Sequence, residues 1–372
     1  MSPGGSLVVL CVNCGSSSLK TALFEVDATT EHDLGRAAQP VEAGDYRAAL
    51  DAALAAFNER GLPAPAAVGH RVVHGGPHHA EPVLVDDGVM AELRELVPFA
   101  PLHMPAAISG MEAIDARWDI PQVACFDTAF HHDMPALAQR LPLPEAITDA
   151  GVRRYGFHGL SYEYVVGAVG ASELGRGVIA HLGNGASMVA VRDGKSVDTT
   201  MGFTPTSGLL MSTRTGDLDP GVPVYLLREL GYDADRLERL VDRESGLVAL
   251  GGTSDMQALV ERRAGDPRAA FAVDAFCYDA RQHVGALAAT LGGLDTLVFT
   301  GGIGEKAASI RAGICRGLEH LGVALDGAAN EAHAGVISPS GAGCTVRVVP
   351  TDEDLVIARH TGALVVGDWR AA

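Results

Sequence analysis

Three glycine-containing turns in this sequence offer donors for phosphate oxygens. The first, NCGSSSLK at 13–20, combines a glycine, three serines and Lys20. The second and third are HLGNGAS at 181–187 and FTGGIGE at 299–305. Backbone amides, hydroxyls and an ammonium group all bind phosphate oxygens. Each turn alone is typical of a tight hairpin, but the three together predict a polyphosphate ligand.

The first turn joins two apolar runs, residues 7–12 and 21–26, which predict two strands. We expect Gly15, Ser16 and Ser18 to present free backbone amides. The turn is not a Walker A loop, because GxxxxGK[ST] is absent and no helix follows it.

An acid and several thiols and imidazoles are the other groups with chemistry to consider. Asp127 directly follows a predicted buried strand at 123–126, where it is either a site acid or a strand-end ion-pair partner. Cys11 and Cys14 have the spacing of a redox or zinc motif, but they lie within a predicted strand, so we expect reduced structural thiols. HExxH is absent, and the 14 histidines form no compact ligand set, so no zinc is expected.

The remaining patterns predict the elements that position these groups. A helix is predicted over 45–60 and another over 267–291, and strands are predicted near 68–73 and 294–299. Residues 177–197 predict two strands and a hairpin turn at Asp193-Gly194. The final helix is expected to begin with Thr351 or Asp352 as its N-cap.

One internal similarity predicts how the chain is organised. Residues 8–27 and 177–195 share the order apolar strand, small polar turn, apolar strand, one domain length apart. We expect the two hairpins to open two domains and to hold a polyphosphate from both sides of a cleft.

Composition limits the classes of protein. The chain has 372 residues, enough for two domains, and 47% of them are hydrophobic. A formal net charge of −18 argues against nucleic-acid binding. The apolar start is too short for a signal peptide and no stretch reaches membrane-span length, so no membrane association and a cytoplasmic location are expected.

Eight motifs together resemble the acetate kinase family, in the same order and over nearly the whole chain. They are NCGSSSLK, HRVVHGG, FDTAFH, RYGFHGLSYEYV, HLGNGAS, MGFTPTSG, STRTGDLDPG and FTGGIGE. The resemblance implies an α/β fold of two ribonuclease H-like, actin-like ATPase domains around a central cleft. It implies an acceptor-side domain of 1–130 with 354–372, whose C-terminal helix packs back on it, and a nucleotide-binding domain of 131–353.

The resemblance also implies the reaction. ATP and acetate give ADP and acetyl phosphate by direct in-line transfer, with Mg²⁺ (Mn²⁺ as an alternative ion), in a homodimer. A carboxylate acceptor is already ionised, so it needs cations to approach the γ-phosphoryl group rather than a base. By resemblance Arg71 holds acetate, and Arg214 and His158 stabilise the transferring group. Asp127 is the essential acid, which we interpret as orienting an arginine or the water shell of magnesium.

The resemblance implies three further sets of residues. The nucleotide is expected at Ser16, Ser18, Lys20, His181, Leu182, Gly183, Asn184, Gly185, Asp255, Met256, Gln257, Gly302, Ile303, Gly304, Glu305 and Lys306. The metal is expected near Asn13 and Glu353. The apolar acceptor pocket is expected to hold Val73, Leu102, Phe157 and Pro205 beside Arg71. Val73 favours acetate over longer acids, although a methylene is worth only about 1–3 kcal/mol.

The sequence departs from the family pattern at three places. TDED replaces the usual TNEE, so Asp352 and Asp354 flank the retained Glu353. Lys306 stands where asparagine is usual, and either reaches a phosphate or is a solvated residue at a helix start. Gln257 stands where arginine is common. Lys306 and Gln257 bear on which nucleotide is bound, and how tightly, more than on which reaction is catalysed.

Three alternatives remain open at this stage. The first is a kinase for propionate or butyrate, which pocket volume distinguishes. The second is a non-enzymatic chaperone or filament protein of the same fold, for which no extra domain is visible. The third is a sugar kinase, which requires a carboxylate base and a polar pocket.

Overall fold

The computed structural model describes residues 6–15 and 17–367. This part of the chain divides into two compact units. Unit 1 comprises residues 6–132 and 352–367, and unit 2 comprises Asp133–Thr351. Each unit packs helices on a mixed β-sheet, so the predicted α/β class is confirmed. Ser16, expected to contact phosphate, lies outside the described residues.

Unit 1 contains a sheet with the strand order β3-β2-β1-β4-β6-β5. The strands are β1 (Leu7–Cys14), β2 (Ser18–Val26), β3 (Glu31–Pro40), β4 (Ala67–Val72), β5 (Val83–Leu84) and β6 (Gln122–Phe126). β1 to β3 form an antiparallel meander, whereas β1, β4 and β6 run parallel. The carboxyl ends of the three parallel strands therefore share one edge of the sheet.

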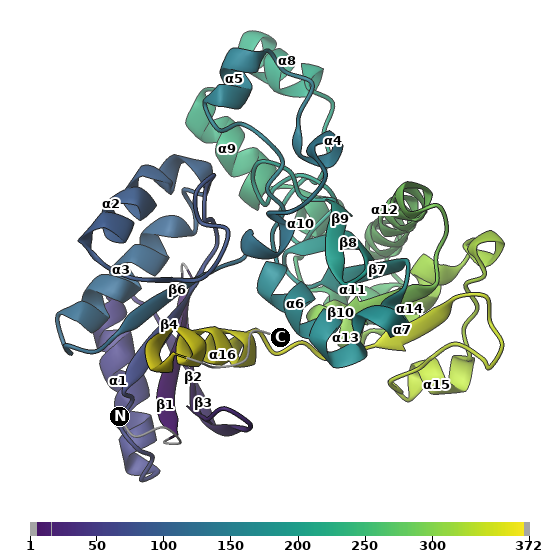
Figure 1. Cartoon of the computed structure of the whole chain (residues 1–372). Coiled ribbons are helices and arrows are strands. Elements are labelled where there is room, and N and C mark those ends of the chain that lie inside the picture. The colour runs from purple at the N-terminus through teal and green to yellow at the C-terminus, as the bar shows by residue number, and fades with distance from the viewer. Residues whose placement is uncertain (1–5, 16, 368–372) are drawn as a thin grey trace. The chain divides into compact units, whose positions relative to one another are not determined.

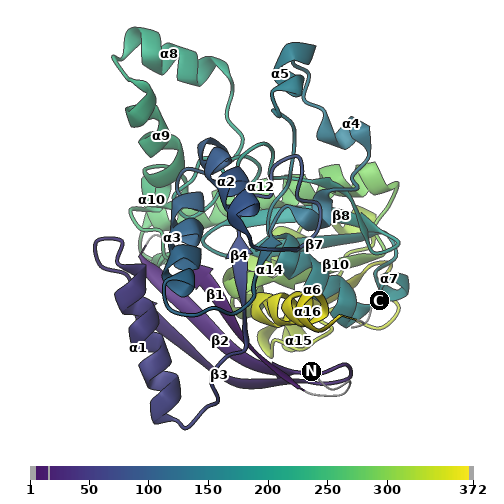
Figure 2. The ribbon, with the colours of Figure 1, turned by 60° about the vertical axis from the view of Figure 1, so that its left-hand side comes forward.

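Helices cover both faces of this sheet (Figures 1 and 2). They are α1 (Tyr46–Glu59), α2 (Asp87–Glu95), α3 (Met104–Asp115) and α16 (Glu353–Val366). One apolar cluster joins α1 and α3 to strand residues such as Leu10 and Val68. The next residue of β4, Gly69, faces α16 instead, where a Cβ atom would collide with Thr361 and Ile357. The glycine therefore lets the C-terminal helix lie directly on the strand.

Unit 2 repeats this strand arrangement. Its sheet order is β11-β10-β7-β8-β9, with β7 (Gly177–Leu182), β8 (Ala186–Arg192), β9 (Lys195–Thr199), β10 (Thr296–Thr300) and β11 (Thr345–Val348). β7 to β9 form an antiparallel meander, and β10 and β11 run parallel to β7. The hairpin turn at Asp193-Gly194 has positive φ at both residues, as a tight primed turn requires.

Unit 2 contains twelve described α-helices. They are α4 (Ala136–Gln139), α5 (Glu145–Asp149), α6 (Gly159–Val169), α7 (Ala171–Leu174), α8 (Gly221–Glu229), α9 (Ala234–Arg243), α10 (Gly246–Gly251), α11 (Met256–Arg262), α12 (Pro267–Leu291), α13 (Gly301–Lys306), α14 (Ala308–Cys315) and α15 (Gly327–Glu331). α12 packs on β8, and α8 and α9 project from the sheet of this unit (Figure 1). In the part of the chain that the structure describes, no helix is both long and apolar enough to cross a bilayer.

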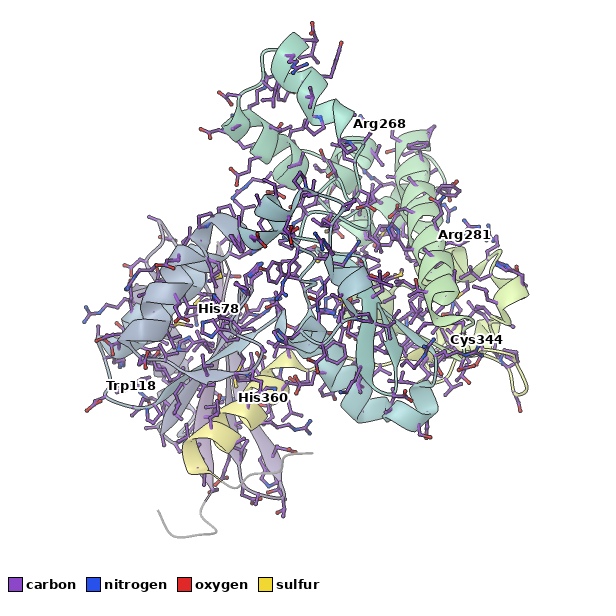
Figure 3. The ribbon with its side chains drawn as sticks, turned by 45° about the horizontal axis from the view of Figure 1, so that its top comes forward. His78, Trp118, Arg268, Arg281, Cys344 and His360 are labelled. Carbon is purple, nitrogen blue, oxygen red and sulfur yellow. The ribbon has the colours of Figure 1, made fainter. Side chains whose placement is uncertain are left out.

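The α12 and α14 helices of unit 2 pack against each other. Figure 3 labels Arg281 on α12, whose guanidinium donates to the Arg316 carbonyl at 2.7 Å just after α14. Cys277 on α12 and Cys315 on α14 are buried, as is Cys344 (Figure 3). All six cysteines are free thiols, as the sequence predicted.

Most of the expected elements are confirmed, but three strands, β3, β5 and β11, were not predicted. α12 has the expected bounds, because Asp266 caps its first turn and Gly292 ends it. α16 begins after Asp352, whose side chain accepts from the Leu355 amide at 3.1 Å. β3 carries the sequence EHDLGRAAQP, which has no apolar alternation because it is an exposed edge strand.

Candidate active-site residues

An arginine and a carboxylate meet where β4 and β6 end in unit 1. Arg71 lies on β4, and Asp127 follows β6, whose register continues through a 2.9 Å hydrogen bond from the Asp127 amide to the Val72 carbonyl. The Arg71 Nε lies 3.1 Å and its Nη2 2.8 Å from Asp127 Oδ2. Asp127 is 1% exposed, whereas Arg71 is 21% exposed. The carboxylate therefore fixes one edge of the guanidinium fork.

A second acid approaches the same guanidinium from α16. Glu353 Oε2 lies 3.6 Å from Arg71 Nη1. The neighbouring acids are held by Arg36 of β3, whose guanidinium lies 2.5 Å from Asp352 and 3.1 Å from Asp354. Arg36 thus anchors the first turn of α16 on both sides of Glu353.

These charges shift the pKa values of the groups that they contact. Burial acts to lower the pKa of Arg71, but Asp127 and Glu353 outweigh it and raise that pKa above its usual value. Burial raises the pKa of Asp354 to about 6, although Arg36 opposes the shift. Arg71 is therefore a permanent cation.

The first glycine turn differs from the expectation in one respect. The Gly15 amide is not free, because it donates to the Ser18 carbonyl at 2.8 Å. The Tyr46 hydroxyl donates to the Gly15 carbonyl at 2.9 Å, which ties the turn to α1. Lys20 is exposed and stands opposite Asn13 in the β1–β2 register. Ser18 begins β2 and is half-buried.

The second glycine turn lies beside two stacked histidines in unit 2. His181 is on β7, and His158 precedes α6 with a left-handed φ of 59°. Their ring centroids are 4.2 Å apart with an interplanar angle of 17°. A Cβ on Gly185 would lie 3.3 Å from both His158 Nε2 and Arg214 Nη1. The turn, one histidine and one arginine therefore meet at a point where a side chain has little room.

The loop that carries Arg214 is held in place by several hydrogen bonds. Arg214 Nη1 donates to the Pro205 carbonyl at 3.1 Å. The Leu210 amide donates to Asp279 at 2.8 Å, and the Gly208 amide donates to Asp217 at 2.8 Å. His283 lies near both carboxylates, 3.8 Å from Asp217 and 3.7 Å from Asp279.

The third glycine turn begins α13 after β10, as expected. A Cβ on Gly301 would lie 2.8 Å from the Leu182 carbonyl oxygen, so this turn closes on the end of β7. Glu305 accepts from the Gly301 and Thr351 amides at 3.0 and 3.2 Å. Its carboxylate therefore organises the turn. Lys306 is the exposed last residue of α13, so it does not begin a helix as one hypothesis proposed.

The other expected residues fall in both units. Val73 packs against the apolar cluster around Phe126 in unit 1, and Leu102 is half-buried just before α3. In unit 2, Phe157 and Pro205 are buried. Asp255 caps α11 by accepting from the Gln257 amide at 2.9 Å, and Met256 is buried there.

The sequence did not indicate several residues that hold the candidate residues of each unit in place. Arg36, Ser161, Tyr162 and Ser187 were not singled out. Arg36 contacts two acids, Ser161 and Ser187 each form a hydrogen bond with a histidine, and Tyr162 forms one with Ser187. Ser187 is the last residue of the HLGNGAS motif, and only its register opposite His181 reveals its place. Arg36 lies in β3, one of the strands that were not predicted.

The family model described as the acetokinase family matches residues 32–359. The chain belongs to the acetokinase family. An acetate kinase from Micrococcus luteus is 44% identical over 97% of this chain and 100% of its own length. One from Rhodopseudomonas palustris is 45% identical over 97% of this chain and 99% of its own length.

Solved structures of this family share the fold. A propionate kinase from Francisella tularensis superposes with a TM-score of 0.88 at 34% identity, covering 96% of this chain and 100% of its own. An acetate kinase from Porphyromonas gingivalis gives a TM-score of 0.84 at 35% identity, with the same coverage. The predicted actin-like ATPase fold of two domains is confirmed for this acetokinase family member.

Proposed function

We infer that the chain transfers a phosphoryl group from ATP to acetate, giving ADP and acetyl phosphate, and catalyses the reverse reaction. The acetokinase family match and the acetate kinase relatives support this activity. The observation that carries it within this chain is Arg71. Its guanidinium, at the end of β4, is a permanent cation held by the buried Asp127 carboxylate that follows β6. A carboxylate acceptor is an anion and requires such a cation near the phosphoryl donor.

We assign acetate binding to Arg71 and the orientation of Arg71 to Asp127. Asp127 is paired through two nitrogens of the guanidinium, so it acts as an orienting acid rather than a base. The acceptor carries no proton to remove, and a general base would contribute nothing to its reactivity. The bidentate contact instead restricts the direction in which Arg71 presents its remaining donors.

We assign to unit 2 the stabilisation of negative charge on the transferring phosphoryl group. His158 Nε2 and Arg214 Nη1 lie beside the Gly185 backbone. A loose transition state spreads negative charge over the phosphoryl oxygens, and donors placed in advance stabilise it. The glycine turns at 183–185 and 301–304 are assigned to the nucleotide phosphates and adenosine, because they offer backbone without side chains.

Mg²⁺ is the ion that we assign to the reaction. The side chains of Asn13 and Glu353 offer amide and carboxylate oxygens, which are ligands that Mg²⁺ accepts. Among the described residues, no group of three or more His, Cys, Asp or Glu could hold a metal. This suits an ion that takes most of its ligands from water and nucleotide. When bound, Mg²⁺ would neutralise charge on the phosphates.

The test is an acetyl-phosphate trapping assay with Mg-ATP and acetate, propionate, butyrate or no acid. We expect acetate-dependent product that falls about 100- to 1,000-fold in Arg71→Ala, since one site donor is worth 10²–10³. Arg94→Ala is the matched control, because Arg94 forms an exposed ion pair in the same unit. ATP hydrolysis that is indifferent to every acid would contradict the proposal.

Propionate is the second candidate acceptor, because the Francisella tularensis relative in the same fold is a propionate kinase. Val73 is the side chain proposed to limit acceptor length, together with Leu102, Phe157 and Pro205. In Val73→Ala, we expect propionate to gain about tenfold on acetate in kcat/KM. Equal turnover of both acids by the unchanged chain would keep the mechanism and broaden the acceptor.

We propose that two copies of the chain associate through α8. Its side chains Val222, Val224, Tyr225 and Leu227 are exposed and apolar. Such a patch is typical of an interface. Multi-angle light scattering is expected to give twice the 38.5 kDa chain mass, and Tyr225→Asp with Leu227→Asp to give the single mass. We place the protein in the cytoplasm, where its free thiols remain reduced.

A further inference from the structure

The two stacked histidines of unit 2 are each held by a serine. His158 Nδ1 lies 2.8 Å from the Ser187 hydroxyl, and His181 Nδ1 lies 2.8 Å from the Ser161 hydroxyl. Both serines are fully buried. The two bonds use the same nitrogen of each ring, so Nε2 is the nitrogen that each imidazole turns toward the glycine turn.

The glycine turn shows where these Nε2 atoms lie. His158 Nε2 is 3.3 Å from the position of a Cβ on Gly185, and His181 Nε2 is 3.7 Å from that of Gly183. Arg214 Nη1 is 3.3 Å from the same Gly185 position. His158 therefore presents Nε2 where the phosphoryl oxygens are assigned, and it can donate there only if Nε2 carries a proton.

The Ser187 hydroxyl forms a second hydrogen bond, with a tyrosine hydroxyl. The Tyr162 hydroxyl lies 2.5 Å from Ser187 Oγ, and Tyr162 is fully buried in the first turn of α6. A phenol is a stronger acid than an alcohol, so Tyr162 is the better donor to Ser187. Ser187 can then donate its own proton to His158 Nδ1. This order places the imidazole proton on Nε2.

The close stacking of the two imidazole rings also favours an uncharged His158. Two imidazolium charges on rings whose centroids are 4.2 Å apart would repel each other strongly at this partly buried place. A hydroxyl that donates to Nδ1 lets the ring remain neutral and still donate from Nε2. A neutral ring with its proton on Nδ1 would instead present a lone pair to an anion.

We propose that Ser187 and Tyr162 are positioning residues that fix His158 in the tautomer with its proton on Nε2. The proposal rests on the proposed function, because it gives that donor a phosphoryl oxygen to bind. Ser161 holds His181 through the corresponding nitrogen. Neither Ser187 nor Tyr162 touches substrate; both act through the His158 ring.

The experiment combines nitrogen NMR of ¹⁵N-histidine-labelled protein with steady-state kinetics. His158→Gln identifies the His158 signals among the 14 histidines. We expect a protonated Nε2 and an unprotonated Nδ1 in the unchanged chain, without substrate. In Ser187→Ala the share of protonated Nε2 falls, and kcat falls about 10- to 100-fold, with each KM within about threefold. Tyr162→Phe gives a smaller change of the same kind, and Ser187→Thr restores kcat.

The matched control is Thr296→Val, which removes a buried hydroxyl that donates to the Glu173 carbonyl at 3.0 Å, at the other end of the same sheet. It should leave both readouts unchanged. A proton on Nδ1 of His158 in the unchanged chain would overturn the proposal. So would a fall in kcat without a tautomer change, or a folded Ser187→Ala with full kcat. Absence of acetyl-phosphate formation by the unchanged chain would overturn the proposed function instead, since the tautomer is read without substrate.

Discussion

The two units share a strand order but hold their functional groups by different means. Unit 1 takes Arg71 directly from a strand and fixes it with the charge of Asp127. Unit 2 takes His158 from a helix N-cap and Arg214 from a loop, and fixes them through hydroxyls and backbone carbonyls. The first turns differ likewise: one is tied by Tyr46, and the other lies against two imidazole rings.

The two units therefore depend on different interactions to keep their functional side chains in position. The register of β4 with β6 sets the position of Arg71, so a single ion pair is enough to orient its guanidinium. A loop has no register, so the Arg214 segment needs close backbone contacts and several hydrogen bonds. We therefore expect unit 1 to be affected most by substitutions that remove a charge. We expect unit 2 to be affected most by side-chain atoms added where the backbone is closely packed.

The largest effect is expected from Gly246→Ala in unit 2. Gly246 has a φ of 65°, and a Cβ there would collide with the Met211 carbonyl oxygen and lie 2.7 Å from that of Arg214. Backbone atoms cannot rotate away, so we expect a loss of about 4 kcal/mol in unfolding free energy and loss of transfer activity. Urea unfolding measures it, with Gly231→Ala as control, since Gly231 also has positive φ (67°) but open space. Equal losses of unfolding free energy in both variants would show that the positive φ, and not the collision, causes the destabilisation.

Asp127→Ala is expected to have the next largest effect, and to act through charge. It leaves the Arg71 guanidinium with Glu353 at 3.6 Å. Removing one partner of a buried pair is costly, so we expect about 3 kcal/mol of destabilisation together with loss of activity. The double variant Asp127→Ala/Arg71→Met should recover most of the stability and none of the activity. If it recovers no stability, packing rather than charge explains the loss.

The units should respond to pH in opposite directions. Burial lowers the pKa of His70 on β4 to about 4, although its bond to Gln122 opposes this. Protonation is thus easier in the unfolded chain, and stability falls as pH drops from 6.5 toward 4, by about 2 kcal/mol at pH 5. Burial acts to lower the pKa of His283 in unit 2, but Asp217 and Asp279 raise it. Its contribution is complete below 6.5 and is lost as pH rises through the folded pKa.

Hydrogen exchange separates the two responses, followed in peptides from β4 and from α12 at pH 5 and 7. Protection of β4 should fall on acidification, while α12 should be better protected. His70→Gln and His283→Gln should each flatten only the response of its own unit. The same slope in both units would contradict the comparison. His32→Gln, an exposed change in unit 1, is the control.

The smallest effect is expected from Tyr46→Phe, which frees the first glycine turn from α1. One hydrogen bond is lost, so we expect about 1 kcal/mol of destabilisation. Because Ser18 and Lys20 of this turn are expected to contact the nucleotide, KM for ATP should rise about twofold while KM for acetate stays unchanged. A rise in both constants would show that the turn supports the whole of unit 1. Calorimetry and initial rates measure these two effects.

The sequence predicts features that depend on local pattern. Asp266 and Gly292 define α12, and strand–turn–strand periodicity defines β7 and β8. β3 was not predicted, because an exposed edge strand has no apolar pattern. The three glycine turns were found by composition. Ser187 and Tyr162 lie within the HLGNGAS and RYGFHGLSYEYV motifs, but nothing in the sequence shows that they contact each other or His158. Contacts between residues far apart in the chain, such as Arg36 with Asp352, need the fold itself.

The return of α16 to unit 1 sets an order for folding during synthesis. β1, β4 and β6 leave the ribosome early, but the helix that covers one face of their sheet is made after all of unit 2. Until then that face, including Gly69, remains exposed. Unit 2 is one continuous segment and can fold first, since domains generally fold as units. Arg71 thus gains Glu353 as a neighbour last of all, so the nascent chain stays inactive until the final helix has been made.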